Sequence, residues 1–297
     1  MGRERYQRIQ KLWIAPTTVT LLNEAAEALM LIPEVITIDE KLKPFEGESP
    51  CIRYVPNKNP HNGHWITETT VKGRATGLPY LLNCIPIQEK EGPAMVEIFK
   101  QALERIGEDD RKRVVVVADA YYLDDRSRTW LREGGFKYLM AINPTRFKEV
   151  WESIGVEVKA MGQWAVAWNA KTKEAACQYW DPKFGKKYFL TNGFRYHKSD
   201  VPLANIPFKD VYGFLFNTAD RLNHFFVDKG YPYHREGWMY SFDDFHFTAL
   251  IWNSYVLFHE YYAIETNMEW RTYCTELAKE LWERATINIP LFFLRLG

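Results

Sequence analysis

The chain lacks an excess of either charge, a close pair of cysteines and any long apolar run, and each absence excludes a class of protein. Its 38 basic and 38 acidic residues cancel, which argues against a small module that binds nucleic acid through overall positive charge. The four cysteines are far apart and form no CxxC pair, so neither a zinc site nor a disulfide framework is expected, and a reducing compartment is the default. No apolar run reaches about 18 residues, and the first residues lead into no apolar signal region, so we expect a soluble, intracellular protein.

The composition does provide for a large hydrophobic core. Apolar residues make up 46% of the 297 positions, so no part of the chain is expected to be disordered on composition alone. The length fits one large domain with an insertion as well as two small domains. There is no internal repeat and no low-complexity segment.

The order of the predicted elements is that of an α/β fold. Residues 1–34 have the loose apolar spacing of a helical segment. Extended runs are predicted at 35–38, 51–55, 65–71, 78–87, 114–118 and 138–142. The early runs suggest an antiparallel meander, with a loop at 56–64. Helices are predicted at 92–105, 124–133, 217–227 and 241–262. Between them, 146–216 alternates short extended pieces with turns, which indicates a β-rich insertion.

Two aspartates follow predicted strands. Asp39 comes at the end of the β-branched run 35–38, and Asp119 comes directly after the apolar run 114–118, which is typical of a strand buried on both faces. Open α/β sheets bind ligands beyond the carboxyl ends of their strands, so the two carboxylates converge if the strands are neighbours. Such a pair suits a divalent metal and phosphoryl chemistry. The alternative is that both residues only start turns.

A third acidic residue is available on the predicted helix after the insertion. Asp220 lies near the start of that helix, and Asn223 lies three residues later on the same face. An acid at this place is also often no more than a partner of the helix dipole. Both interpretations stay open on spacing alone.

Several short motifs, taken in order, resemble the piggyBac-type transposases. The segments are Ile38-Asp39-Glu40-Lys41-Leu42-Lys43-Pro44-Phe45, Arg53-Tyr54-Val55-Pro56-Asn57-Lys58, Val117-Ala118-Asp119-Ala120-Tyr121-Tyr122, Ala219-Asp220-Arg221-Leu222-Asn223, Trp238 and Ile251-Trp252-Asn253-Ser254-Tyr255. They cover roughly residues 35–262 and come in the family's order. Each motif is short, but the ordered set is fairly specific.

The resemblance implies an RNase H-like mixed sheet flanked by helices, with a β-rich insertion. The implied parts are a helical segment 1–34, the first part of the core 35–145, the insertion 146–216 and C-terminal helices 217–297. It further implies catalytic aspartates at Asp39, Asp119 and Asp220, and a metal site from these three with Asn223. Two Mg²⁺ ions, or Mn²⁺ in their place, would support cleavage and strand transfer of double-stranded DNA at transposon ends and a target. A nuclear location and a homodimer are part of the same expectation, with no membrane and no small-molecule cofactor.

This sequence departs from the family pattern at several positions. Asn223 stands where the family often has a fourth aspartate, and Ala120 stands where it has asparagine. Neither the family's N-terminal region nor its cysteine-rich C-terminal finger is recognisable, so we expect a truncated or degenerate copy. A catalytically inactive, transposase-derived protein that binds DNA or a partner is therefore the alternative function. A third hypothesis is a structural α/β protein without a nucleic-acid role, and only the neutral net charge supports it.

Basic residues gather in the loop region that follows the first motif. The candidate DNA contacts are Arg53, Lys58, His61, His64, Lys72 and Arg74. An ordinary solvated loop is the alternative. In the insertion, Lys183, Lys186 and Lys187 with Trp180 and Phe184 present rings beside charges, as nucleic-acid surfaces do. The same pattern also fits a hairpin turn flanked by core aromatics.

Overall fold

A single mixed sheet organises the part of the chain that the structure describes. The computed structural model describes residues 23–24, 34–45, 52–56, 61–87, 94–148, 158–193, 208–229, 238–262 and 268–287. The nine strands within these ranges are β1 (Val35–Pro44), β2 (Ile52–Tyr54), β3 (Asn62–Lys72), β4 (Pro79–Pro86), β5 (Val115–Ala118), β6 (Lys137–Ala141), β7 (Trp164–Asn169), β8 (Glu174–Asp181) and β9 (Gly185–Thr191). The predicted α/β class, a mixed sheet with helices, is confirmed, whereas the helix predicted for 1–34 lies almost wholly outside the described residues.

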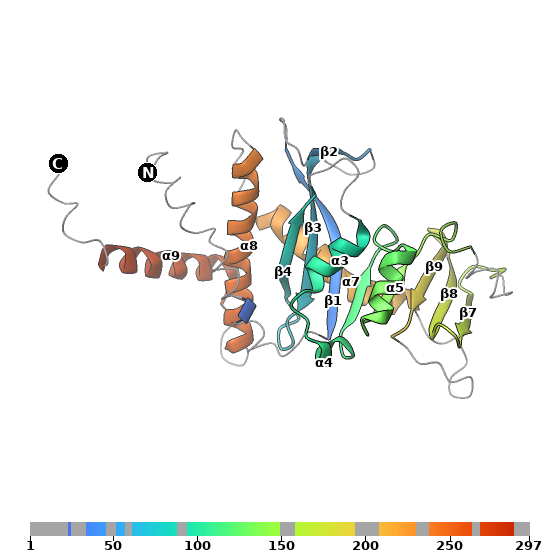
Figure 1. The fold of residues 1–297 in the computed structure, drawn as a ribbon. Coiled ribbons are helices and arrows are strands. Elements are labelled where there is room, and N and C mark those ends of the chain that lie inside the picture. The colour runs from blue at the N-terminus through green and yellow to red at the C-terminus, as the bar shows by residue number, and fades with distance from the viewer. Residues whose placement is uncertain are drawn as a thin grey trace.

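The strands follow the order β2-β3-β1-β5-β6-β9-β8-β7, and β4 pairs with β3. β1 is antiparallel to β3 and parallel to β5, and β5 is parallel to β6. The long early strands β1, β3 and β4 form the predicted antiparallel meander, whereas the short β2 pairs with the start of β3 and not with β1. The strands of the expected insertion do not form a separate sheet, because β9 pairs antiparallel with β6 and extends the core sheet (Figure 1).

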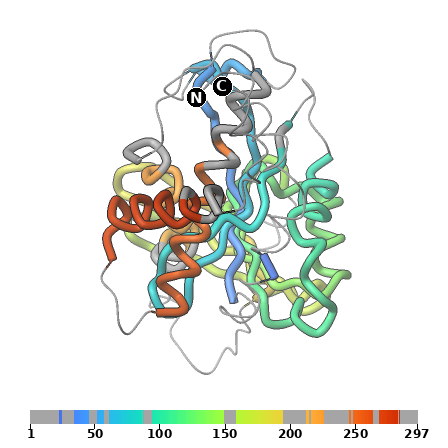
Figure 2. Tube along the Cα trace, turned by 90° about the vertical axis from the view of Figure 1, so that its left-hand side faces the viewer, coloured from blue at the N-terminus to red at the C-terminus, as the bar shows by residue number. Residues whose placement is uncertain are grey.

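Helices cover both faces of the sheet. The described helices are α3 (Met95–Leu103), α4 (Glu108–Arg111), α5 (Asp125–Glu133), α7 (Phe208–Lys229), α8 (Trp238–Tyr261) and α9 (Trp270–Ile287). α3 and α5 lie on one face and α7 crosses the other, while α9 lies beyond α8, away from the sheet (Figures 1 and 2). None of the helices in the described ranges combines the length and apolar character that a membrane span requires.

The local sequence explains why the central elements form. Val116 and Val117 of β5 are fully buried in the clusters on opposite faces of the sheet. Burial of each side chain stabilises the fold by about 1.5–3 kcal/mol. α5 begins with a capping box, in which Asp124 accepts from the backbone of Ser127 and the Ser127 hydroxyl accepts from the backbone of Asp124. It ends before Gly135, whose φ of 79° favours glycine.

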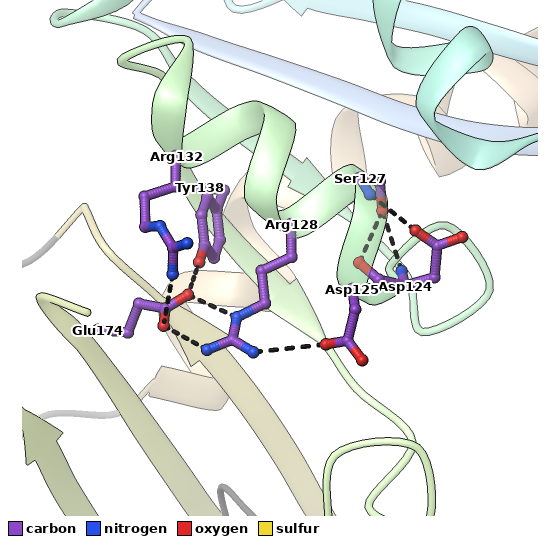
Figure 3. A network of polar contacts seen from close by, with 7 residues as sticks. All are labelled: Asp124, Asp125, Ser127, Arg128, Arg132, Tyr138 and Glu174. Atoms are coloured by element: carbon purple, nitrogen blue, oxygen red, sulfur yellow. Dashed lines mark hydrogen bonds and ion pairs between the residues drawn. The ribbon is translucent and has the colours of Figure 1, made fainter. Parts of the chain in front are cut away.

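Two buried polar contacts hold the outer elements to the sheet. Asn253 of α8 accepts from the backbone N–H of Leu81 at 3.0 Å and donates to the Leu81 carbonyl at 2.7 Å, so it satisfies a free edge of β4. At the other end of the sheet, Glu174 of β8 accepts from Arg128 of α5 and from Tyr138 of β6 (Figure 3). This second network joins the strands of the insertion to the core.

Three element boundaries differ from the prediction in a way that matters for the site. β1 does not end at residue 38 but continues to Pro44, because β3 offers a partner for its whole length. β3 begins at Asn62, inside the segment predicted as a loop. α7 begins at Phe208 rather than at 217, so the last residues of the predicted insertion belong to this helix.

Candidate active site

Asp39 and Asp119 lie side by side where the parallel pairing of β1 and β5 stops. The last paired residues are Ile38 and Ala118, so the two aspartates are the next residues on neighbouring strands. Strands lie about 4.8 Å apart, and matched positions on neighbouring strands project from the same face. That face is the one on which α7 packs, because Val117, two residues before Asp119, belongs to the buried cluster against which Tyr212 and Phe216 of α7 pack. The two strands are thus neighbours, which is the condition for their carboxylates to converge.

One part of the prediction for Asp39 was wrong. Asp39 lies in the middle of β1 and not at its end, because the antiparallel pairing with β3 carries the strand six residues further than the predicted run. Only the pairing with β5 ends there. The consequence is that Asp39 is held on its β3 side by the ladder and is only 9% exposed.

Hydrogen bonds fix the backbone around both aspartates. One carboxyl oxygen of Asp119 accepts from the backbone N–H of Tyr121 at 2.7 Å, and one of Asp39 accepts from the N–H of Glu40 at 2.8 Å. The carbonyl of Ala118, the residue before Asp119, accepts from the hydroxyl of Tyr212 at 3.3 Å. The turn after β5 is therefore anchored both by its own aspartate and by α7.

The hydroxyl of Tyr212 is affected by the charge of all three predicted catalytic residues. Burial raises its pKa above the ordinary tyrosine value, and the negative charges of Asp119, Asp39 and Asp220 raise it further. The pKa of Tyr122, on the other face, is raised by burial, then by Glu40, and also by Asp39 and Asp119. The field of Asp220 therefore reaches the same tyrosine as the fields of the strand aspartates.

Asp220 and Asn223 lie on α7, near the strand aspartates but not in one compact group with them. The side chain of Asp220 is exposed, whereas the carbonyl oxygen of Asn223 is buried and has no hydrogen-bond partner among the described residues. Within those same residues, no three acidic, histidine or cysteine side chains stand close enough to hold a metal ion.

The donor chemistry of these four residues nevertheless suits a divalent ion. Three carboxylates and one amide carbonyl are hard oxygen ligands of the kind that Mg²⁺ prefers. The buried amide oxygen of Asn223 is an acceptor that lacks a donor in the described structure. A cation could bind this oxygen without displacing an existing hydrogen bond.

A buried charged pair beside Asp39 had not been predicted. Glu68 of β3 lies directly opposite Asp39 in the register and is fully buried, and the ammonium of Lys41 lies 3.9 Å from its carboxylate. Burial lowers the pKa of Lys41, although the charge of Glu68 opposes this shift. Opposed residues of an antiparallel pair share a face, so Glu68, Asp39 and Asp119 form a row of acids across β3, β1 and β5. Only the register could have identified Glu68, since no motif in the sequence includes it.

The predicted DNA contacts do not form one basic surface. Arg53 of β2 and the exposed His61 lie near the start of β3, and the Arg53 guanidinium lies 5.0 Å from the ring centroid of Trp65. Lys72 and Arg74 lie at the opposite end of β3, next to the first residues of β1 and therefore away from the carboxyl end of the parallel strands. Lys58 lies outside the described residues.

His64 is a correction to the predicted set. Its ring is fully buried and lies tilted against the ring of Phe45, with ring centroids 4.4 Å apart, so it cannot reach DNA in this fold. Burial lowers its pKa to about 4, and the charge of Lys43 adds to this effect. The reason is that β3 begins before His64, so that the residue belongs to the sheet and not to the predicted loop.

The comparisons with known proteins agree with the geometry of the fold. No protein-family model and no curated protein matches the sequence. Among solved structures, the chain is similar to piggyBac transposase in a synaptic complex with hairpin DNA, with a TM-score of 0.70 and 15% identity over 86% of this chain and 54% of that one. The chain therefore spans about half the length of that transposase chain.

A second solved structure is much less similar. Endonuclease V of Ciona intestinalis, in complex with an inosine-containing DNA, gives a TM-score of 0.32 at 14% identity over 73% of this chain and 99% of that one, which is too low to indicate a shared fold. The fold of the chain thus follows from the first comparison together with the strand order and the helices on both faces. The chain has a piggyBac transposase-like, RNase H-like α/β fold.

Proposed function

We propose that this chain is the catalytic region of a DNA transposase, in which Asp39, Asp119 and Asp220 support metal-dependent cleavage and strand transfer. The observation that carries the proposal is the register of β1 and β5, which sets Asp39 and Asp119 next to each other on the face that α7 crosses. Asp220 lies on α7, the helix that packs on this face, which supports its role as the third acid. The fold similarity to piggyBac transposase makes DNA, at transposon ends and in a target, the substrate that we propose.

The metal ligands in this proposal are Asp39, Asp119, Asp220 and Asn223, and the ions would be Mg²⁺ or Mn²⁺. When bound, such ions activate water or a 3′-hydroxyl and stabilise the leaving oxygen of an in-line displacement. The residues of the chain do the positioning. The ladder of β3 holds Asp39, the N–H of Tyr121 orients the carboxylate of Asp119, and Tyr212 holds the carbonyl before it.

Strand transfer from a pre-cut DNA end tests this function most simply, because it requires the chemistry without prior cleavage. We expect joined product that depends on Mg²⁺ or Mn²⁺, and its loss in Asp119→Ala. Asp109→Ala is the matched control, since Asp109 is an exposed acid on the short helix α4 before β5. Equal product from Asp119→Ala and Asp109→Ala would refute the proposed mechanism.

A transposase-derived protein that binds DNA without cutting it is the second candidate function. The observation in its favour is that no three metal-binding side chains are grouped within the described residues, with Asp220 exposed on α7. Salt-dependent DNA binding, unchanged by Asp119→Ala and without joined product at any metal concentration, would support this function over catalysis. In either case the nucleus is the location that we propose, since the substrate would be chromosomal DNA, and a homodimer is the assembly to test.

A further inference from the structure

The turn between β8 and β9 exposes an aromatic ring that the core does not use. A carboxyl oxygen of Asp181 accepts from the backbone N–H groups of Lys183 and Phe184, at 2.8 and 3.0 Å, and so closes the turn. Gly185 follows with a φ of 75°, a conformation that favours glycine. As a result, the side chain of Phe184 projects from the tip of the hairpin and is 62% exposed.

Positive charge surrounds this ring. The ammonium groups of Lys183 and Lys187 lie 5.1 and 5.4 Å from the ring centroid of Phe184, and that of Lys186 lies 5.4 Å from the ring centroid of Trp180. The segment 182–187 contains no acid, and Asp181 before it is buried. An exposed ring beside cations, with no nearby exposed carboxylate in this segment, is complementary to an anion that carries a flat aromatic group.

The register places this tip toward the end of the sheet at which the aspartates lie. β6 runs parallel to β5, and β9 runs antiparallel to β6, so the first residues of β9 lie toward the carboxyl end of β5. Lys187 is two residues before Phe189, which packs in the same cluster as Val117, so Lys187 and Asp119 project from one face. Two strand spacings across and two residues along the strands put their Cα atoms about 12 Å apart.

Aromatic residues continue this face beyond Lys187. Tyr179 lies opposite Lys187, Trp164 lies opposite Tyr179, and the rings of Trp164 and Tyr179 stack with centroids 4.2 Å apart. A DNA strand whose phosphate lies at the aspartates would reach the tip within a few nucleotides, because a strand advances by roughly 3.4 Å per nucleotide.

We propose that the β8–β9 turn binds a single-stranded segment of DNA, with its phosphates on Lys183 and Lys187 and a base stacked on Phe184. Only an unpaired base offers a free face to the ring, which favours a single strand over a duplex. The place of this segment relative to the cleaved bond rests on the function proposed above. The binding itself does not depend on catalysis.

Fluorescence anisotropy of a labelled single-stranded oligonucleotide with the full 297-residue chain tests the proposal. We expect Phe184→Ala to weaken binding about tenfold, since stacking on one ring contributes roughly this much. We expect Lys183→Ala/Lys187→Ala to weaken binding and to lower the slope of log K against log salt by about 1.4, since each contact with a phosphate adds about 0.7. The matched control is Lys159→Ala/Lys171→Ala, which removes two exposed lysines from elsewhere in the insertion.

The outcomes separate this site from general electrostatic attraction. Unchanged binding by Phe184→Ala, an equal loss in the control pair, or tighter binding of the matching duplex would overturn the proposal. All the substituted residues are exposed, so the urea midpoints of the variants should equal that of the parent chain and exclude misfolding as the cause. The anisotropy is measured without divalent metal, under conditions in which strand transfer does not occur, so a failure of strand transfer and a failure of this site are distinguishable.

Discussion

The buried carboxylate of Glu174 leads to the sharpest prediction about stability. It is 2% exposed, and the guanidinium of Arg128 donates to its two oxygens at 2.8 and 2.5 Å. The hydroxyl of Tyr138 donates a further hydrogen bond, and Arg132 lies 3.9 Å away (Figure 3). Arg128→Met would remove the main partner and leave a buried charge with one hydrogen bond and a distant cation. Breaking such a pair costs about 3–5 kcal/mol, and the remaining partners favour the lower end, about 3 kcal/mol.

Urea unfolding at pH 7 measures this cost as the change in the free energy of unfolding. Arg132→Met is the matched control, because Arg132 is one-third exposed and farther from Glu174, so its loss should cost about 0–1 kcal/mol. The double variant Arg128→Met/Glu174→Met removes both charges and should recover most of the stability lost by Arg128→Met. If Arg128→Met costs no more than Arg132→Met, the network does not join the insertion to the core as argued.

The same network predicts a pH dependence. Burial alone would raise the pKa of Glu174, but the hydrogen bonds from Arg128 and Tyr138 lower it below the ordinary value. The carboxylate therefore contributes stability at pH values above its unfolded pKa, near about 4.3, and this contribution is lost as the pH falls through the lower folded value. The stability difference between the parent and Glu174→Gln should shrink between pH 6 and pH 3. A constant difference over this range would contradict the direction of the shift.

Three further predictions concern single residues. Asn253→Ala should lower the free energy of unfolding by about 2 kcal/mol, because two backbone groups of Leu81 lose their partner. A decrease no larger than that of an Asn→Ala variant at an exposed position would contradict this prediction. The NMR signals of His64 should titrate with a midpoint near pH 4, and a midpoint near pH 6.5 would contradict the burial of the ring. Between about pH 4 and 6.5 the unfolded chain binds a proton at His64 that the folded chain does not bind, so the free energy of unfolding should rise with pH over this range. Tyr212→Phe should cost about 1 kcal/mol in urea unfolding through its lost bond to Ala118, and an unchanged midpoint would contradict that bond.

Local patterns predicted much of the fold. The unbroken apolar run before Asp119 predicted a central strand, and the strand, the turn and the buried position are all present. The turn residues after α5 and the alternation within the insertion also predicted real boundaries. These features depend on residues close together in the chain, which is why sequence reasoning reached them.

Pairing over long distances decided what the sequence did not reveal. The extension of β1 beyond Asp39, the burial of His64 and the position of Glu68 all follow from the register between β1 and β3, which no local pattern specifies. In the same way, the strands of the insertion continue the core sheet only because β9 pairs with β6. Motifs predicted Asp39, Asp119 and Asp220 as catalytic residues, and only the fold shows that the charges of all three raise the pKa of Tyr212.

Binding of Mn²⁺ to the folded chain shows whether acids distant in the sequence share a divalent ion. Free Mn²⁺ can be followed by electron paramagnetic resonance during a titration of the parent chain and of Asp39→Asn, Asp119→Asn and Asp109→Asn. We expect saturable binding by the parent and by Asp109→Asn, and at least about tenfold weaker binding by the other two variants. Equal binding by all four proteins, or no saturable binding by the parent, would rule out a metal site at Asp39 and Asp119.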